Sequence, residues 1–257
     1  MLSSMRIIVL TSQKGGSGKT TLSGHLAVQA ELAGHGPVAL IDTDPQGSLA
    51  AWWNARAADA PVFAQTNVQR LFYDLEELRN RGTRLVIIDT PPAVTGTIRN
   101  VVAFADLVVI PTRPSPHDLR AVGATLDIVE GKGKPLVFVV NDATPRARIT
   151  SEAAVALSQH GTVAPVTIHH RTDFASSMID GRTVMECDAE GRSAAEIVEL
   201  WSYIAQRLQK IQPRPVANAM PQDRPVFGRQ EPGLPATEFV PGAVVAGGFG
   251  RRVAQQG

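Results

Sequence analysis

Five short runs of apolar residues recur along the 257-residue chain, and longer stretches with helical periodicity separate them. The runs lack the alternation of apolar and polar positions that marks a strand with one face in water. Continuous apolar runs of this length, joined by helical connections, are typical of parallel strands that are buried on both faces. They span residues 7–10, 38–41, 85–88, 107–110 and 136–140. The pattern therefore predicts an α/β fold with a doubly wound, mostly parallel sheet and helices on both faces.

Polar residues follow every one of these runs. In a doubly wound sheet, ligands bind just beyond the carboxyl ends of the strands, so the residue after each run is a candidate site residue. The five runs lead, in chain order, into a glycine-rich stretch at residues 13–21, Asp42-Thr43-Asp44-Pro45, Asp89-Thr90-Pro91-Pro92, Pro111-Thr112 and Asn141-Asp142. We therefore expect one polar site along this edge of the sheet.

The glycine-rich stretch reads Gln-Lys-Gly-Gly-Ser-Gly-Lys-Thr-Thr from Gln13 to Thr21. The usual nucleotide-binding loop carries glycine where Gln13 stands, so only the second half of that motif, residues 18–20, is present. Glycines at 15, 16 and 18 allow positive φ and turn successive N–H groups toward phosphate oxygens. The helical pattern that follows, to Leu32, places a helix N-terminus at the same point. The stretch predicts a variant phosphate-binding loop.

Within that loop, Lys19 is in position to reach the β and γ phosphates, and Thr20 to ligate Mg²⁺. Carboxylates beside a triphosphate also require a cation between them, which again predicts Mg²⁺. Asp89 fits the metal role, through water, and either Asp42 or Asp44 remains to orient an attacking water. A single Asp after a strand more often caps a turn or a helix. The loop and the three aspartates together favour the metal site.

These motifs carry a family resemblance. Residues 14–20, with residues 42–47 and 89–92, resemble the ParA/MinD family of deviant Walker ATPases, most closely its short ParA branch, across about residues 5–210. The resemblance implies ATP and Mg²⁺ as cofactors and a homodimer with ATP in which Lys14 reaches the partner's nucleotide. It implies catalytic roles for Lys14, Lys19 and Asp44, with Asp44 positioning the hydrolytic water, and a metal shell supported by Thr20, Asp42 and Asp89. The nucleotide-binding residues that it implies are Gly15, Gly16, Ser17, Gly18, Lys19, Thr20, Thr21 at the α phosphate and Asn141 at the adenine.

The same resemblance implies a function. Such ATPases dimerise with ATP, bind DNA without sequence preference and hydrolyse ATP when a ParB-like or other adaptor stimulates them, which segregates or positions a plasmid, a chromosome region or a protein cargo. The amphipathic segment from Ser115 to Glu130 corresponds to the family's dimer interface. Because the chain begins directly at the first strand, we expect no N-terminal helix-turn-helix for operator recognition.

Contact with DNA has to come from a local surface, because the net charge of the chain is only +1. Arg171, Arg182 and Arg192 lie in a segment that corresponds to the family's DNA-binding end and are our candidates for phosphate contacts. Acidic residues are interspersed among them, so an ordinary surface of mixed charge is an equal alternative.

The remaining composition bears on location. A single cysteine, Cys187, fits a reducing compartment, and no apolar stretch approaches the ~18 residues of a spanning helix. We expect a cytoplasmic, nucleoid-associated protein with no membrane partner. The region 213–257, with seven prolines and seven glycines, predicts a disordered tail after an ATPase domain at residues 1–212.

Two other functions use similar loops. A MinD-like membrane-associated positioning ATPase would need an amphipathic membrane helix, and residues 240–252 are too rich in Gly and Ala to form one. A metabolic enzyme is the other alternative: an iron protein of nitrogenase needs cluster cysteines, and a dethiobiotin-synthase-like ligase does not explain the motif at 42–47.

The adjacent Trp52 and Trp53 lie in a predicted helix after the second strand. Adjacent helical positions cannot share one face. We expect one indole in the core and the other at least partly exposed.

Overall fold

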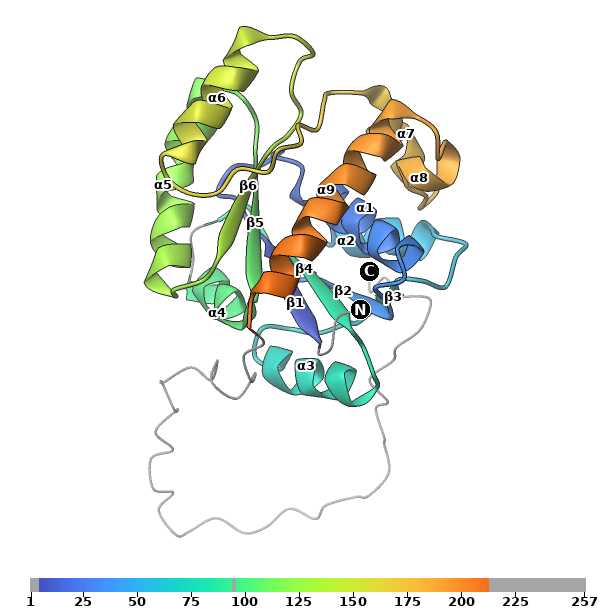
Figure 1. Cartoon of the computed structure of the whole chain (residues 1–257). Helices are drawn as coiled ribbons and strands as arrows, with labels where there is room; N and C mark the ends of the chain where they lie inside the picture. The colour runs from blue at the N-terminus through green and yellow to red at the C-terminus, as the bar shows by residue number, and fades with distance from the viewer. Residues whose placement is uncertain (1–4, 94–95, 213–257) are drawn as a thin grey trace, which may run out of the picture.

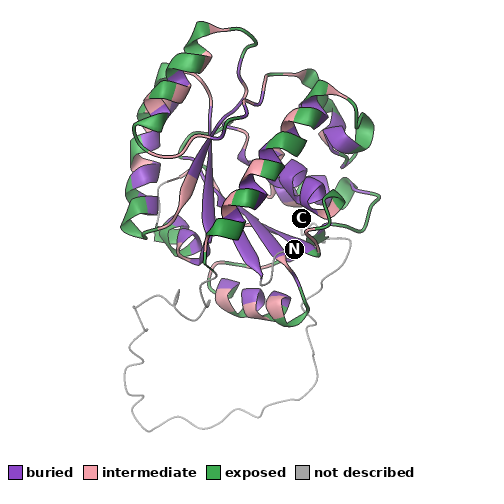
Figure 2. Ribbon diagram, viewed as in Figure 1, coloured by how far each residue is buried: buried purple, intermediate pink, exposed green. Residues whose placement is uncertain are grey.

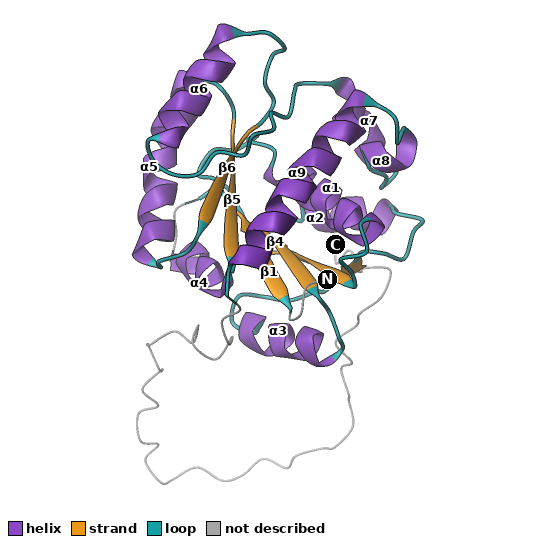
Figure 3. Ribbon diagram, in the orientation of Figure 1, coloured by secondary structure: helices purple, strands orange, loops and turns teal. Residues whose placement is uncertain are grey.

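The computed structural model describes residues 5–93 and 96–212, in which six parallel strands form one sheet between two groups of helices (Figures 1 and 3). The strand order is β3-β2-β4-β1-β5-β6. The strands are β1 (Arg6–Leu10), β2 (Val38–Asp42), β3 (Val62–Phe63), β4 (Leu85–Asp89), β5 (Leu107–Thr112) and β6 (Leu136–Val140). The predicted fold class is confirmed, and all five apolar runs are strands. The two-residue edge strand β3 is too short to leave a pattern in the sequence.

Both faces of the sheet are buried, which explains why the runs are apolar throughout (Figure 2). Along β1, Ile8 and Leu10 enter one hydrophobic cluster, and Ile7 and Val9 enter the cluster on the opposite face. Side chains of a strand point alternately to the two faces. A strand covered on both sides therefore needs an apolar residue at every position.

The helices divide between these two faces. The first cluster receives α1 (Lys19–Leu32), α2 (Ser48–Ala55), α7 (Thr172–Met178), α8 (Val184–Cys187) and α9 (Arg192–Lys210). The second receives α3 (Leu71–Asn80), α4 (Gly96–Phe104), α5 (Pro116–Gly131) and α6 (Arg148–Ser158). Helix α9 shows the cause in its sequence, because Ile197, Leu200, Trp201 and Ile204 recur on one stripe and are all buried.

The expectation of one exposed tryptophan is wrong, because Trp52 is 5% and Trp53 is 3% exposed. The two indoles do leave α2 on different sides. Trp52 packs on Gly24 of α1, and Trp53 packs beside Phe63 of β3, with ring centroids 5.5 Å apart. Helix α2 therefore lies between two partners, and each side receives one ring.

The parallel register brings the predicted polar residues to one edge. Asp42 at the end of β2 is opposite Asp89 at the end of β4, and Leu10 at the end of β1 is opposite Asp89 on the other side. The phosphate loop therefore begins between β4 and β5. No helix among the described residues has the length and apolar character to cross a membrane. The predicted tail at 213–257 lies outside the described residues.

Candidate phosphate-binding site

The loop between β1 and α1 has the backbone that its glycines allow. Gly16 has a φ of 72° and Gly18 a φ of 92°, which are values that residues with a side chain rarely adopt. Gly18 is also the N-cap of α1, whose first residue is Lys19. The loop thus ends at a helix N-terminus, where free N–H groups and the helix dipole favour an anion.

Asn141, at the end of β6, holds this loop from the side. Its Nδ2 donates to the carbonyl oxygen of Ser17 at 2.8 Å, and a Cβ built on Gly18 would lie 2.1 Å from the same Nδ2. Glycine at position 18 is therefore required both by its φ and by this close approach. In this structure the amide of Asn141 contacts the loop backbone; its predicted role at the adenine stays a prediction.

The two lysines of the loop lie in opposite environments. Lys19 is 6% exposed, and its Nζ is 3.5 Å from the carbonyl oxygen of Lys14. Burial lowers the pKa of the Lys19 ammonium, and the charges of Asp89 and Asp44 act in the opposite direction. Lys14, in contrast, is exposed and makes no ion pair with any residue of 5–93 or 96–212. The Lys19 ammonium is enclosed by its own loop, whereas the Lys14 ammonium is available to a ligand or a partner outside the loop.

Thr20 and Asp89 meet at the first turn of α1. The Thr20 hydroxyl donates to Asp89 Oδ2 at 2.5 Å, and Asp89 is only 1% exposed. Burial raises the pKa of Asp89 to about 7; the Thr20 hydrogen bond and Lys19 lower it, while nearby Asp42 adds to the increase. A carboxylate with a raised pKa beside a hydroxyl is short of positive charge, which a divalent cation would supply.

Asp42 and Asp44 have different hydrogen bonds. Asp42 Oδ2 accepts from the N–H groups of Leu49 and Ala50 at 3.0 and 3.1 Å, and its Oδ1 accepts from Asp44 N at 2.9 Å. Asp42 therefore caps the start of α2, in addition to any part in a metal shell. Asp44 Oδ1 accepts only from Gln46 N among the described contacts, at 3.0 Å. The half-buried Asp44 keeps the freer carboxylate of the two.

The residues present fit a nucleotide with its magnesium ion. Ser17 Oγ is buried and has no hydrogen-bond partner among the described residues. Thr20 and Asp89 offer the hard oxygen ligands that Mg²⁺ prefers. When bound, the metal and phosphates would supply the opposite charges that Asp89 and Lys19 lack. The predicted residues 14–21 and Asp89 are thus brought together at one edge.

One residue of this edge was missed by the sequence reasoning, namely Arg113. It follows β5 directly, and its Nη1 would lie 3.6 Å from a Cβ built on Gly16. A basic residue one position beyond Pro111-Thr112, at the end of an apolar run, was the signal that could have found it.

The three arginines predicted to contact DNA have different surroundings. Arg171 forms a bidentate pair with Glu196 at 2.7 and 2.8 Å, and His169 Nδ1 lies 2.7 Å from the same carboxylate. Arg182 pairs with Asp180 at 2.8 Å. Arg192 is exposed at the start of α9 and makes no ion pair among the described residues. Of these three arginines, Arg192 alone presents a guanidinium without an ion pair in the described part of the chain.

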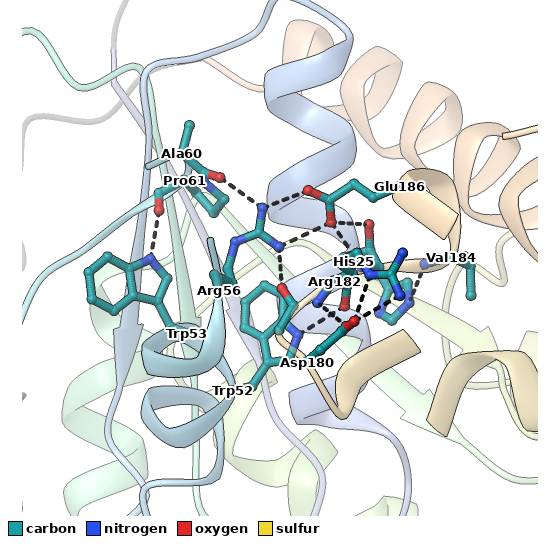
Figure 4. A network of polar contacts seen from close by, with 12 residues as sticks. His25, Trp52, Trp53, Arg56, Ala60, Pro61, Asp180, Arg182, Val184 and Glu186 are labelled. Atoms are coloured by element: carbon teal, nitrogen blue, oxygen red, sulfur yellow. Dashed lines mark hydrogen bonds and ion pairs between the residues drawn. The ribbon is translucent and has the colours of Figure 1, made fainter. Parts of the chain in front are cut away.

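A second polar cluster links α2 to the segment 181–186 (Figure 4). Arg56 Nη1 donates to the Gly181 carbonyl at 2.6 Å, and the guanidinium pairs with Glu186 at 2.8 and 3.1 Å. Its Nη2 also donates to the Ala60 carbonyl at 3.0 Å, and Trp52 Nε1 donates to the Arg182 carbonyl at 3.1 Å. We call these contacts the Arg56–Glu186 network.

Helix α1 reaches the same segment through His25. Its Nδ1 is 2.8 Å from the Thr21 carbonyl, and Val184 N donates to its Nε2 at 3.2 Å. These contacts require a neutral ring with the proton on Nδ1. Complete burial lowers the pKa of His25 to about 4, so the ring stays neutral near pH 7.

Comparison with known proteins agrees with this geometry. Residues 8–184 match the family model described as the CobQ/CobB/MinD/ParA nucleotide binding domain. The chain is 31% identical, over 203 residues that are 74% of it and 91% of the relative, to maintenance of carboxysome distribution protein A of Halothiobacillus neapolitanus. It is 29% identical over 155 residues to the chromosome-partitioning ATPase Soj of Thermus thermophilus, covering 49% of this chain and 62% of that protein.

Solved structures share the fold at lower identity. Apo McdA of Cyanothece superposes with a TM-score of 0.64 at 18% identity, covering 79% of this chain and 99% of that one. The MinC:MinD complex of Aquifex aeolicus gives a TM-score of 0.66 at 16% identity, with 78% and 96% covered. A putative plasmid partition protein of Borrelia burgdorferi bound to AMPPNP gives 0.61 at 16% identity, with 79% and 100% covered.

Proposed function

The chain belongs to the CobQ/CobB/MinD/ParA nucleotide-binding family, and from this premise we propose that it is a positioning ATPase. In this proposal the chain dimerises when it binds ATP, and the dimer binds DNA. The family's ParA and MinD members are nucleotide-binding ATPases, among them the partitioning ATPase Soj. For this chain we propose Mg²⁺-dependent hydrolysis that an adaptor stimulates, and location on the nucleoid. The relative from Halothiobacillus neapolitanus bears a name that refers to carboxysome distribution, which favours a large protein assembly as cargo.

The contrast between the two loop lysines carries this proposal. Lys19 is enclosed by the loop, whereas Lys14 is exposed and its ammonium group has no partner among the described residues. Two copies of the chain facing each other would bring like charges together, unless each Lys14 met the phosphates of the other copy. A bound triphosphate therefore stabilises the dimer, and hydrolysis of the triphosphate lets the two copies separate. The amine of Lys14, supplied in trans, would act on the phosphates as an arginine finger does in phosphoryl transfer.

Catalysis is proposed to rest on Asp44. Its carboxylate has the fewest competing contacts among Asp42, Asp44 and Asp89, so it is the group best placed to orient water. Asp42 and Asp89 would support the metal shell with Thr20.

The test uses the purified chain with Mg²⁺ and ATP on DNA-coated beads. We expect Asp44→Ala to bind ATP as the wild type does and to remain on DNA, because the bound state no longer turns over. The control variant Glu76→Ala removes a carboxylate on helix α3. It should bind ATP, hydrolyse it and leave DNA as the wild type does. Rapid ATP turnover by Asp44→Ala would contradict the assigned role.

The same beads test the surface that holds DNA. Replacing Arg171, Arg182 and Arg192 together by Glu should weaken retention and leave ATP binding intact. Unchanged retention would place the DNA surface elsewhere. Sedimentation with phospholipid vesicles separates the MinD-like alternative, because ATP-dependent pelleting with vesicles and no retention on DNA would favour a membrane partner.

A further inference from the structure

Arg113 lies next to the phosphate loop because β5 lies next to β1 in the sheet. Leu10 of β1 is paired with Val109 of β5, and Thr11 N donates to the Val109 carbonyl at 3.1 Å as the loop begins. Gln13 N then donates to Thr125 Oγ1 of α5 at 3.2 Å. The connection between β5 and α5, which contains Arg113, therefore forms one wall of the phosphate site.

The guanidinium of Arg113 faces the loop. A Cβ built on Gly16 would lie 3.6 Å from Nη1, so this nitrogen is in contact range of the loop at one of its glycines with positive φ. Successive N–H groups of a glycine-rich loop of this kind bind anions.

The direction of Arg113 is set by Asp118. Arg113 Nε donates to Asp118 Oδ1 at 3.0 Å, and Arg113 Nη2 donates to Asp118 Oδ2 at 3.4 Å. Asp118 is 4% exposed, and the Ser115 hydroxyl also donates to it at 2.5 Å. The carboxylate thus uses the edge of the guanidinium that Nε and Nη2 form. Nη1 donates to no residue in the described part of the chain and remains free for a ligand.

Arg113 and Lys14 line the same cavity, which has a volume of about 420 Å³. Its charged walls also include Asp118, already paired with Arg113, and Asp142, which lies 2.5 Å from His170 Nδ1. Both carboxylates therefore have partners, whereas the Lys14 ammonium and one nitrogen of Arg113 have none in residues 5–93 and 96–212. This imbalance suits an anion.

We propose that Arg113 donates from Nη1 to the terminal phosphate of the ATP held in the same chain's loop, and that this contact makes the site prefer ATP over ADP. Asp118 is the positioning residue that aims the guanidinium. The inference rests on the proposed function, because it needs a nucleotide in the loop. It adds a further cation in cis, beside Lys19, to the one that Lys14 supplies in trans.

The test compares affinities of the full chain for a fluorescent non-hydrolysable ATP analogue and for the matching ADP, both with Mg²⁺. In Arg113→Ala the preference for the ATP analogue should fall ~10-fold, the size expected from one lost hydrogen bond to a charged group, with ADP affinity nearly unchanged. Arg113→Lys should recover part of the preference. Asp118→Asn should lose less than Arg113→Ala, because the guanidinium remains but is less well aimed.

The control is Arg81→Ala, which removes another arginine paired with a carboxylate, Glu77 on helix α3, far from the strand carboxyl ends. It should leave both affinities unchanged. Melting curves of each variant confirm that binding is measured on folded protein.

Three outcomes would overturn the proposal. An unchanged preference in Arg113→Ala, or an equal loss for both nucleotides, would make Arg113 a packing residue of the loop. An effect that disappears in a Lys14→Ala background, in which we expect no dimer, would assign the contact to the partner's nucleotide. If the wild type bound neither nucleotide, the proposed function itself would fail.

Discussion

The phosphate site and the Arg56–Glu186 network both contain buried charge, and they treat it in opposite ways. In the network, Arg56 makes four hydrogen bonds and its guanidinium carbon lies 4.9 Å from the centre of the Trp52 ring. In the phosphate site, Ser17 Oγ has no partner among the described residues, and Asp89 has a pKa raised to about 7. The Arg56 guanidinium is matched within the fold except at Nε, which has no partner among the described residues, whereas Ser17 Oγ and the charge of Asp89 are left for a ligand to match.

The largest effect on nucleotide binding should come from the phosphate site. We expect Lys19→Ala to weaken ATP binding by on the order of 100-fold or more, because removing one partner of a buried charged contact costs about 2–5 kcal/mol. The midpoint of unfolding without nucleotide should hardly fall, since Lys19 is desolvated in the free protein. Calorimetric titration and urea unfolding measure the two quantities. A large loss of stability with unchanged affinity would remove the contrast between the two regions.

The reverse result is expected in the network. Arg56→Ala should lower the free energy of unfolding by about 3–5 kcal/mol, because it leaves Glu186 partly buried without its partner. Nucleotide affinity, measured well below the melting temperature, should stay the same. The matched control is Arg182→Ala, which breaks the neighbouring exposed pair with Asp180 and should change stability little. Equal losses in the two variants would contradict a structural role for the network.

His25, which contacts the same segment 181–186 as the network, gives stability a pH dependence. Its pKa is about 4 in the folded chain against an ordinary value of 6.5, so the unfolded chain binds more protons between these values. The contribution of His25 to stability should be complete above about pH 6.5 and fall by roughly 1.4 kcal/mol per unit as pH drops toward 4, about 3 kcal/mol in all. Asp89, whose pKa is raised from 3.8 to about 7, acts in the opposite direction over the same range.

Urea unfolding at pH 7 and pH 4.5 tests this expectation. Because only the His25 contribution is removed, His25→Gln should lose less unfolding free energy than the wild type between pH 7 and pH 4.5. The difference between the two pH values should not change in His160→Gln, in which the residue removed is exposed. A His25→Gln variant with the full pH dependence of the wild type would show that other groups are responsible.

The smallest effect concerns the proposed DNA contacts. Arg171 is neutralised by Glu196, so Arg171→Ala should change retention on DNA little, whereas Arg192→Ala should weaken it several-fold and lower the salt slope by about 1. Retention measured over a series of salt concentrations distinguishes them. A larger loss in Arg171→Ala would mean that its pair with Glu196 opens on DNA.

The sequence could predict what adjacent residues determine. The apolar runs, the glycines at 16 and 18 and the aspartates at strand ends are local patterns, and the sheet places them together by its general topology. The Arg56–Glu186 pair joins residues 130 positions apart, and no pattern in either segment specifies it. Arg113 depends in the same way on the adjacency of β1 and β5.

The burial of both tryptophans had a similar cause. To predict it, one would need to know that the two-residue strand β3 covers the second side of α2. Local sequence shows that adjacent rings point apart, but it does not show what lies on each side.

The most direct test of the account is the mass of the particle in solution by sedimentation, with Mg²⁺ and a non-hydrolysable ATP analogue. We predict twice the 27.4 kDa of one chain for the wild type, and one chain for Lys14→Ala with the analogue still bound. A wild-type chain that is saturated with the analogue and stays at the mass of one copy would contradict the proposed dimer and the role of Lys14.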